Sequence, residues 1–405
     1  MNTARYIARR WAFSTPLRHT RNILRMGMGS MGLCVAVMVI SLCVLVGFKT
    51  EISRKVFGFG SHVVVQPYWS ENENESVFLS WDSALQAEVL RHEGIVSAQA
   101  YTLKGALIKG KEESFGVFFK GLPPNFDTSF FARKLLRGHL PDFREQAASQ
   151  QVLVSELLAR KLRVDTGQRL RAFFVHQGEL RPRALTVCGI YATGLETFDA
   201  SYVIGDISLV QQINAWDSTQ ADGVDVSLRN PDDRFRIAQI LNQDLPYEYS
   251  SFPCDRLFPA IFDWLALVDT NVFVLIVIML IVCMICLVSL LFILLIERRP
   301  HVGVLKTLGA DNRLVRHIFI LQTLTILGRS LLVGNAVALA LCVLQKVSGV
   351  LQLDESVYFL DRVPIAFPWL SIVGINLLVM GLAALLLYAL SFLINKTSPA
   401  SLHRA

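Results

Sequence analysis

Apolar residues are concentrated in four long runs along this chain. The runs span residues 26–48, 271–296, 318–345 and 369–394. The third contains one charged residue, Arg329, and the other three contain none. A helix needs about 20 apolar residues to cross a bilayer core of about 30 Å. Buried helices of soluble proteins are rarely so long and so evenly apolar, so the pattern predicts four transmembrane helices.

The first run follows a basic arm, residues 1–25, that has six arginines and no acidic residue. A cleavable signal peptide is one interpretation of such a start. However, the run is longer than the apolar core of a typical signal peptide, and no small-residue cleavage site follows Phe48. We therefore expect the first run to stay in the protein as a membrane anchor.

The charges between the runs predict an orientation under the positive-inside rule. Basic residues prevail in the arm 1–25, the segment 297–317 and the tail 395–405, which we expect to be cytoplasmic. Acidic residues prevail in the loop 346–368 and in the segment 49–270, which we expect outside. The chain's net charge of +6 thus belongs to its cytoplasmic pieces and indicates contact with anionic lipid, with no nucleic-acid partner.

The outside segment 49–270 is long enough to build its own core. Its apolar periodicity predicts a mixed α/β domain inserted between the first and second spans, and hence an α+β membrane protein. The expected elements are a strand at 62–66, helices at 81–92, 155–162 and 230–246, two strands around a turn at 110–112, and a hairpin with its tip near Gln177 and Gly178.

Two features of this segment have alternative interpretations. Cys188 and Cys254 are the cysteines outside the apolar runs, and they either form a disulfide or stay free. Aromatic residues near the two membrane ends suit either an interfacial belt or the domain core. They are Phe57, Phe59, Tyr68, Phe258, Phe262 and Trp264.

No motif in the chain indicates covalent chemistry. Residues 27–32 spell G-x-G-x-x-G, but they follow an arginine-rich arm and open an apolar run, whereas a dinucleotide site needs a βαβ unit. Close packing of helices through small residues explains them better. A phosphate-binding loop and an H-E-x-x-H motif are absent, and no His pair has metal-ligand spacing. We expect no catalytic residue, no metal site and no cofactor in this chain.

The segment 297–317 connects the second and third spans with more residues than a turn requires. Pro300 suits the first turn of a helix and Gly309 suits its end, which predicts a short helix from His301 to Leu308. Asp311 is the expected N-cap of the next helix. The short helix would present an apolar strip to the cytoplasm, made of Val302, Val304, Leu305 and Leu308. Such a strip favours a partner surface over a simple turn.

The stretch ERRPHVGVLKTLGA, residues 297–310, resembles the E-[KR]-x-x-x-[IV]-[GA]-[IV]-[LM]-[KR]-x-[LI]-G-A signature of FtsX-like ABC transporter permeases. FKTEISRKVFGFGSHVVV, residues 48–65, and LFPAIFDWLALVDTNVFVLIVIMLIV, residues 257–282, are similar to the lipoprotein-releasing LolC/LolE subfamily. The order of one span, a large outside domain and three further spans is similar too.

This resemblance implies a MacB-like periplasmic domain with Porter and Sabre lobes, the Sabre lobe lying near residues 126–218. It also implies that the short helix is a coupling helix, docked into a separate LolD-like ATPase that binds ATP and Mg. The coupling residues would be Glu297, Arg298, Arg299, His301, Val302, Val304, Leu305, Lys306, Leu308 and Gly309.

Further partners follow from the resemblance. They are a second permease in a homo- or heterodimer, an acylated lipoprotein taken from the inner membrane, and a LolA-like periplasmic chaperone. The hairpin near 174–183 would meet the chaperone, although it is short for that role and its tip is equally explained as a solvated turn. The candidate contact residues are Phe174, His176, Gln177, Arg181 and Arg183.

Arg329 is the charged residue inside a predicted span. Gln322 and Thr325 lie seven and four residues before it, so the three share one helix face. A charge at the bilayer centre costs roughly 2.5 to 3.5 kcal/mol on insertion scales. One hypothesis is that this stripe lines a substrate cavity between two permeases. The alternative is an arginine that only orders the helix bundle or reaches the interface.

Three other functions remain alternatives at this point. They are a MacB-like efflux permease, an FtsX-like permease that transmits mechanical signals, and a membrane receptor whose outside domain only binds. The receptor would not need a coupling helix.

Overall fold

A computed structural model describes residues 18–68, 77–110, 113–143, 149–354, 358 and 360–394. The chain divides into two compact units. The first, called here the helical unit, comprises Met1–Thr50, Trp264–Gln352 and Arg362–Ala405. The second, the sheet unit, comprises Glu51–Asp263 and Leu353–Asp361.

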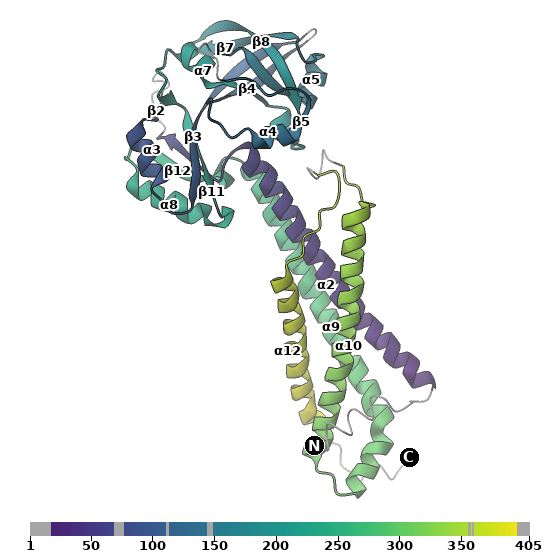
Figure 1. The fold of residues 1–405 in the computed structure, drawn as a ribbon. Helices are drawn as coiled ribbons and strands as arrows, with labels where there is room; N and C mark the ends of the chain where they lie inside the picture. The colour runs from purple at the N-terminus through teal and green to yellow at the C-terminus, as the bar shows by residue number, and fades with distance from the viewer. Residues whose placement is uncertain are drawn as a thin grey trace. The chain divides into compact units, whose positions relative to one another are not determined.

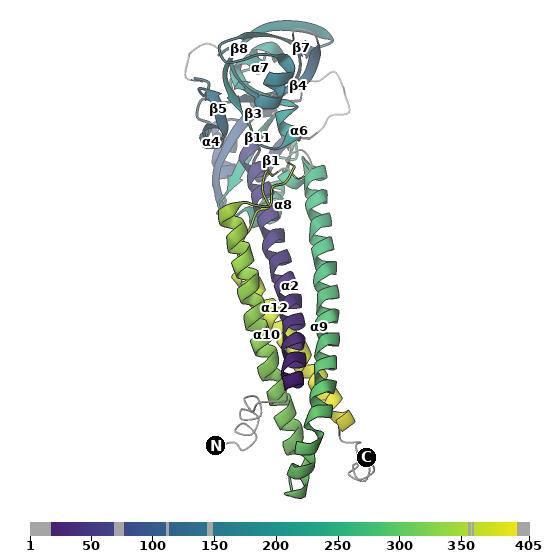
Figure 2. The same ribbon diagram turned by 90° about the vertical axis from the view of Figure 1, so that its right-hand side faces the viewer.

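Among the described residues, four long helices build the helical unit, and each apolar run of the sequence lies within one of them (Figure 1 and Figure 2). They are α2 (Arg18–Phe59), α9 (Pro259–Thr307), α10 (Asn312–Ser348) and α12 (Trp369–Ile394). All four are long and apolar enough to cross a membrane. The bounds of α12 coincide with the predicted run, whereas the other three helices extend past theirs, because helical backbone does not stop where hydropathy falls.

Helix α2 passes close to α10 through a pair of glycines. A Cβ on Gly334 would lie 2.4 Å from the carbonyl oxygen of Gly32, so both positions require glycine's bare backbone for this approach. A Cβ on Gly27 would lie 2.5 Å from the side chain of Leu290 on α9. Gly27 and Gly32 of the G-x-G-x-x-G stretch are therefore helical packing positions, as expected from their context, whereas Gly29 has open space around its Cβ position.

A reciprocal amide pair joins α10 to α12. Asn335 Nδ2 donates to Asn376 Oδ1 at 2.7 Å, and Asn376 Nδ2 donates back to Asn335 Oδ1 at 3.2 Å. Polar groups in an apolar bundle are satisfied by such interhelical bonds.

The described part of the sheet unit contains one ten-stranded sheet and a small two-stranded pair. The strands of the large sheet are β1 (Val63–Pro67), β3 (Ile95–Lys109), β4 (Ser114–Leu122), β5 (Leu135–Gly138), β6 (Gln151–Ser155), β7 (Arg169–His176), β8 (Glu179–Tyr191), β9 (Tyr202–Asp206), β11 (Gly223–Leu228) and β12 (Tyr249–Pro253). The pair is β2 (Leu79–Ser80) with β10 (Gln220–Ala221).

Part of the large sheet closes on itself. The order β3-β4-β9-β6-β8-β7 returns to β3, because β7 pairs with both β8 and β3. Closure removes free strand edges and encloses a core. Inward side chains such as Ile108, Phe119 and Val187 fill that core together with α5 (Glu156–Leu162) and α7 (Ile207–Asn214). This part is called the barrel lobe below.

The remaining part, called here the flanking lobe, is built from both ends of the inserted segment. Strands β12, β1 and β11 pair in order with the first half of β3. Helices α3 (Ser83–Leu90) and α8 (Arg234–Asp244) bury Val89 and Leu241 against the valines of β1 and β11. The mixed α/β domain expected between the first two spans is confirmed. The barrel lobe begins earlier than the middle lobe expected near residues 126–218, because β3 and β4 are part of its closed ring.

Short elements complete the unit. They are α4 (Ser129–Lys134), α6 (Glu196–Asp199), η1 (Pro231–Asp233) and η2 (Cys254–Arg256).

Local sequence signals correspond to the structure at several points. Asp82 caps α3 by accepting from the Leu85 amide, and Ser155 caps α5 by accepting from the Leu158 amide. The β7–β8 hairpin turns at Gln177 and Gly178, both with positive φ, as a two-residue type I′ turn requires. The turn expected at 110–112 includes Lys111 and Glu112, which lie outside the described residues.

The structure answers the question about the cysteines and part of the question about the aromatic residues. Cys188 and Cys254 are both free and buried. Phe59, at the end of α2, is buried and stacks on Phe198 with ring centroids 4.4 Å apart, so it belongs to the domain core. Tyr68 is instead exposed.

The expectation that Pro300 begins a new short helix is wrong. Helix α9 runs without interruption from Pro259 to Thr307, and Pro300 lies inside it. Proline's fixed φ near −65° is compatible with a helix, and its missing N–H removes one hydrogen bond without stopping the chain. The helix ends where expected, since Gly309 has a φ of +86° just beyond it.

Candidate functional site

The described end of α9 presents an apolar surface. Val304 and Leu308, one helical turn apart, are 61% and 78% exposed. The Leu308 amide still donates to the Val304 carbonyl at 3.2 Å, so the two side chains are held on one face. The side chains of Glu297, Arg298, Arg299, His301, Val302, Leu305 and Lys306 lie outside the described residues.

The segment then turns back at once. After Gly309, Asp311 occupies the N-cap position of α10 with an extended backbone. Its main-chain carbonyl accepts from Leu314 and Val315, while its side chain makes no capping hydrogen bond. The sequence therefore placed the cap residue correctly, and the exposed apolar pair sits directly before a tight, helix-capped turn.

The three residues of the α10 stripe differ in burial. Gln322 is buried, and its Oε1 has no hydrogen-bond partner within the described part of the chain. Thr325 is exposed and donates to the Leu321 carbonyl, and Arg329 is half-buried. The stripe thus lies along the border between the buried and exposed faces of α10. Whether it lines a substrate cavity stays a prediction.

The β7–β8 hairpin end of the barrel lobe is basic. Arg181 Nη1 donates to the carbonyl of Ile213 near the end of α7, at 2.7 Å, and Lys104 Nζ donates to Asn214 Oδ1 at 2.5 Å. Partial burial, followed by the charges of Arg181 and Lys104, lowers the pKa of His176. This end of the lobe therefore carries more basic than acidic side chains, with Glu179 as the acid at the tip.

Phe174 must be removed from the candidate contact residues. It is fully buried in the barrel lobe, where its ring lies 5.5 Å from that of Phe119. The period-2 alternation of β7 points it inward together with Ala172 and Leu170. His176, Gln177, Arg181 and Arg183 are exposed or half-buried and remain candidates.

Sequence reasoning missed an apolar pair at the same tip. Val175 and Leu180 are directly paired across the hairpin and are 53% and 62% exposed. Exposed cross-strand apolar pairs are contact candidates. The alternation of β7 predicts Val175 on the face opposite to Phe174, which is the signal that could have found it.

A second missed feature is a buried ion pair in the sheet unit. Lys120 Nζ lies 2.7 Å from Asp225 Oδ2, and the two side chains are 7% and 6% exposed. Ser61 Oγ donates to Asp225 Oδ1 at 3.0 Å, and Lys120 Nζ also lies 3.4 Å from the carbonyl of Phe59 at the end of α2. The network thus ties the last residue of α2 to β4 and β11.

Two family models match the chain. The model described as MacB-like periplasmic core domain matches residues 28–243, and the model described as FtsX-like permease C-terminal matches residues 273–399. The first covers more than half of the chain. The chain belongs to the FtsX-like ABC transporter permeases. This permease is therefore a membrane protein with a periplasmic domain, and its family is not itself catalytic.

The permease is similar along most of its length to lipoprotein-releasing system transmembrane proteins LolC. It is 22% identical to LolC of Xylella fastidiosa strain Temecula1 over 86% of both chains. It is also 22% identical to LolC of Neisseria meningitidis serogroup B over 93% of both chains.

Solved structures give weaker likenesses. The periplasmic region of MacB from Actinobacillus actinomycetemcomitans is 13% identical with a TM-score of 0.34, over 51% of this chain and 95% of that chain. The extracellular domain of the noncanonic ABC-type transporter YknZ from Gram-positive bacteria is 13% identical with a TM-score of 0.32, over 47% and 98%. The assignment rests on the family models.

Proposed function

We propose that this permease takes part in releasing acylated lipoproteins from the inner membrane, passing them to a LolA-like periplasmic chaperone. The carrying observation is the similarity to LolC proteins, which is colinear over 86% or more of each chain and includes both units. The finer assignment to a LolC-like or LolE-like position, in a homo- or heterodimer, is left to experiment.

In this proposal the work is done by a partner ATPase. A LolD-like subunit binds ATP and Mg, and this chain holds neither. The exposed pair Val304 and Leu308 is the described part of the surface that the ATPase would cover. Contact with this apolar pair would connect the helix to the conformation of the ATPase. ATP could then shift the permease between two conformations, to the extent that it binds one of them more tightly than the other.

The orientation belongs to the proposal as well. With both termini cytoplasmic, the apolar end of α9 faces the ATPase, and the family-matched core domain lies in the periplasm. The basic hairpin end, with Arg181, Arg183 and the apolar pair Val175 and Leu180, would then be available to an acidic chaperone surface.

The test is reconstitution. The permease, its candidate ATPase and a second permease are placed in proteoliposomes with an acylated lipoprotein, and ATP-dependent release to a soluble chaperone is measured. We expect release that requires ATP, Mg and the lipid anchor of the cargo. ATPase activity that couples to the permease without lipoprotein release would instead favour an efflux or mechanotransmitting permease.

A further inference from the structure

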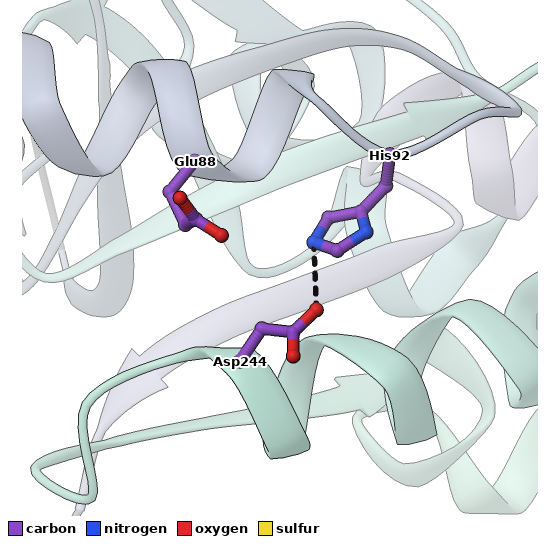
Figure 3. Close-up of side chains that lie close together, drawn as sticks. All are labelled: Glu88, His92 and Asp244. Carbon is purple, nitrogen blue, oxygen red and sulfur yellow. Dashed lines mark ion pairs between the residues drawn. The ribbon is translucent and has the colours of Figure 1, made fainter.

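Three side chains of types that can bind a metal ion meet in the flanking lobe, one from α3, one from the bend after it and one from α8 (Figure 3). Glu88 lies in the last turn of α3, and His92 follows four residues later in the bend after that helix. Asp244 is the last residue of α8. One ligand atom from each of the three lies within 4.8 Å of the other two.

The position of the two carboxylates creates a need for positive charge. Both lie at C-terminal helix ends, where the helix dipole disfavours acidic groups. Neither helix has a basic residue within its last turn, and the nearest one is Arg91, the exposed C-cap residue of α3. Two negative helix ends and two carboxylates therefore converge on the imidazole of His92, and this potential attracts a cation.

The contact between His92 and Asp244 is long for a hydrogen bond and has the spacing of two ligands of one metal ion. The side chain is 13% exposed, and its Nε2 is buried with no hydrogen-bond partner among the described residues. Asp244 Oδ2 lies 3.4 Å from this nitrogen, beyond the usual N–H···O range of about 2.7–3.2 Å. In a tetrahedral zinc site, Zn–N and Zn–O bonds of about 2.0–2.2 Å place the two ligand atoms roughly 3.3–3.5 Å apart.

We propose that Glu88, His92 and Asp244 bind a divalent transition-metal ion, with Zn²⁺ as the best fit, and that the ion clamps α3 to α8. One imidazole with two carboxylates suits zinc, whereas calcium and magnesium prefer oxygen ligands alone. Water completes the tetrahedron. The clamp adds to the apolar contact that Val89 and Leu241 already make in the same core.

One competing interaction is weak enough to yield. Arg91 Nη1 lies 3.6 Å from Glu88 Oε1, but the Arg91 side chain is 75% exposed. Exposed ion pairs of this kind contribute little to stability, because water screens the two charges. Arg91 can therefore turn to solvent when Glu88 binds the ion.

The experiment uses the full chain in detergent, stripped with a chelator and titrated with Zn²⁺ by calorimetry. We expect one ion per chain at this site and a rise in melting temperature. His92→Gln, Glu88→Gln and Asp244→Asn each replace an imidazole or a carboxylate by a weaker amide ligand. Each should weaken binding at least tenfold, because the loss of even an outer-shell partner of a ligand costs about 10–100-fold in metal affinity. The matched control is Glu93→Gln, an exposed acid beside the site, which should bind as the wild type does.

X-ray absorption of the zinc complex separates this site from the seven cysteines of the chain. We expect nitrogen and oxygen neighbours, one imidazole and no sulfur. Wild-type affinity in Asp244→Asn, sulfur ligation, or no zinc binding by the wild type would each overturn the proposal. Asp244 is exposed, so its variant keeps the test valid even if His92→Gln fails to fold. The result does not depend on what the permease transports.

Discussion

At the scale of the residue, Lys120 is a buried charge of the sheet unit that depends on several partners. Its ammonium is buried, paired with Asp225, and held 4.9 Å above the ring of Tyr101. Buried charges persist only when partners replace their lost hydration. Here the partners come from β11 and from the end of α2, so one side chain links three elements.

We expect Lys120→Met to destabilise the sheet unit by about 3–5 kcal/mol, because it leaves the carboxylate of Asp225 buried and unpaired. Adding Asp225→Asn should restore much of that loss. Thermal unfolding of the full chain in detergent measures both variants. Equal stability of the single and double variants would show that the pair is not the source of the effect.

His62 makes the sheet unit sensitive to acid. Burial, and then the charge of Arg234, lowers the pKa of its imidazole to about 4 from the usual 6.5. In the neutral ring, Nδ1 accepts from the Leu228 amide at 3.1 Å. The unfolded chain takes up the proton first, so stability is full above pH 6.5 and is lost as the pH falls toward 4.

We expect the melting temperature to fall as the pH drops from 6.5 to 4, and to fall less in His62→Asn than in the wild type. The side-chain oxygen of asparagine can still accept the hydrogen bond from the Leu228 amide, but it does not titrate in this range. Asp222 acts in the opposite direction, because burial raises its pKa to about 6 and protonation then favours folding. The comparison is therefore the difference between variant and wild type. A parallel decline in both would remove His62 from this role.

At the scale of the element, the crossing of α2 and α10 depends on Gly32 and Gly334. Gly334→Ala places a methyl group against a backbone oxygen that has no rotamer to change. We expect a loss of melting temperature in detergent and lower expression. Gly328→Ala, on the same helix with open space around its Cβ, is the control and should be neutral or slightly stabilising. Similar behaviour of the two variants would argue against a close crossing.

The coupling end of α9 has a test at the same scale. Val304→Asp and Leu308→Asp put a charge into the apolar pair, and we expect each to reduce copurification of the ATPase at least tenfold. Thr307→Asp is the matched control, because Thr307 is exposed and lies beside the pair. Its new carboxylate has the same unfavourable interaction with the C-terminal end of the helix. If all three variants copurify the ATPase equally, the pair is not its contact.

At the scale of the whole molecule, the proposed function separates two surfaces. Leu180→Asp and Arg183→Glu at the hairpin tip should impair transfer to the chaperone by several-fold while leaving ATPase copurification and ATP hydrolysis unchanged. Variants at Val304 or Leu308 should instead lower ATPase copurification and, with it, transfer to the chaperone. Loss of hydrolysis in the tip variants would mean that the hairpin end acts on the permease itself and is not a separate receiving surface.

Much of the architecture follows from sequence because its causes are local. Apolar runs define the spans, Asp82 and Ser155 cap helices through their own side chains, and Gln177 with Gly178 fixes a two-residue turn. The coupling signature is likewise contiguous. Pro300 shows the limit, since a local preference for a helix start did not outweigh continuation of α9.

The remaining candidates depend on contacts between distant residues. Phe174 and Val175 are neighbours in sequence, and barrel closure decides that one is core and the other surface. Glu88 and His92 gave no metal signal by spacing, because Asp244, more than 150 residues later, completes their set. Sequence alone determined the spans, the inserted domain and the family, because hydropathy and contiguous motifs record them. The tertiary structure decided the buried ion pair of Lys120 with Asp225, the exposed residues of the β7–β8 hairpin tip and the proposed metal site. Burial and distance arise only when remote segments pack together.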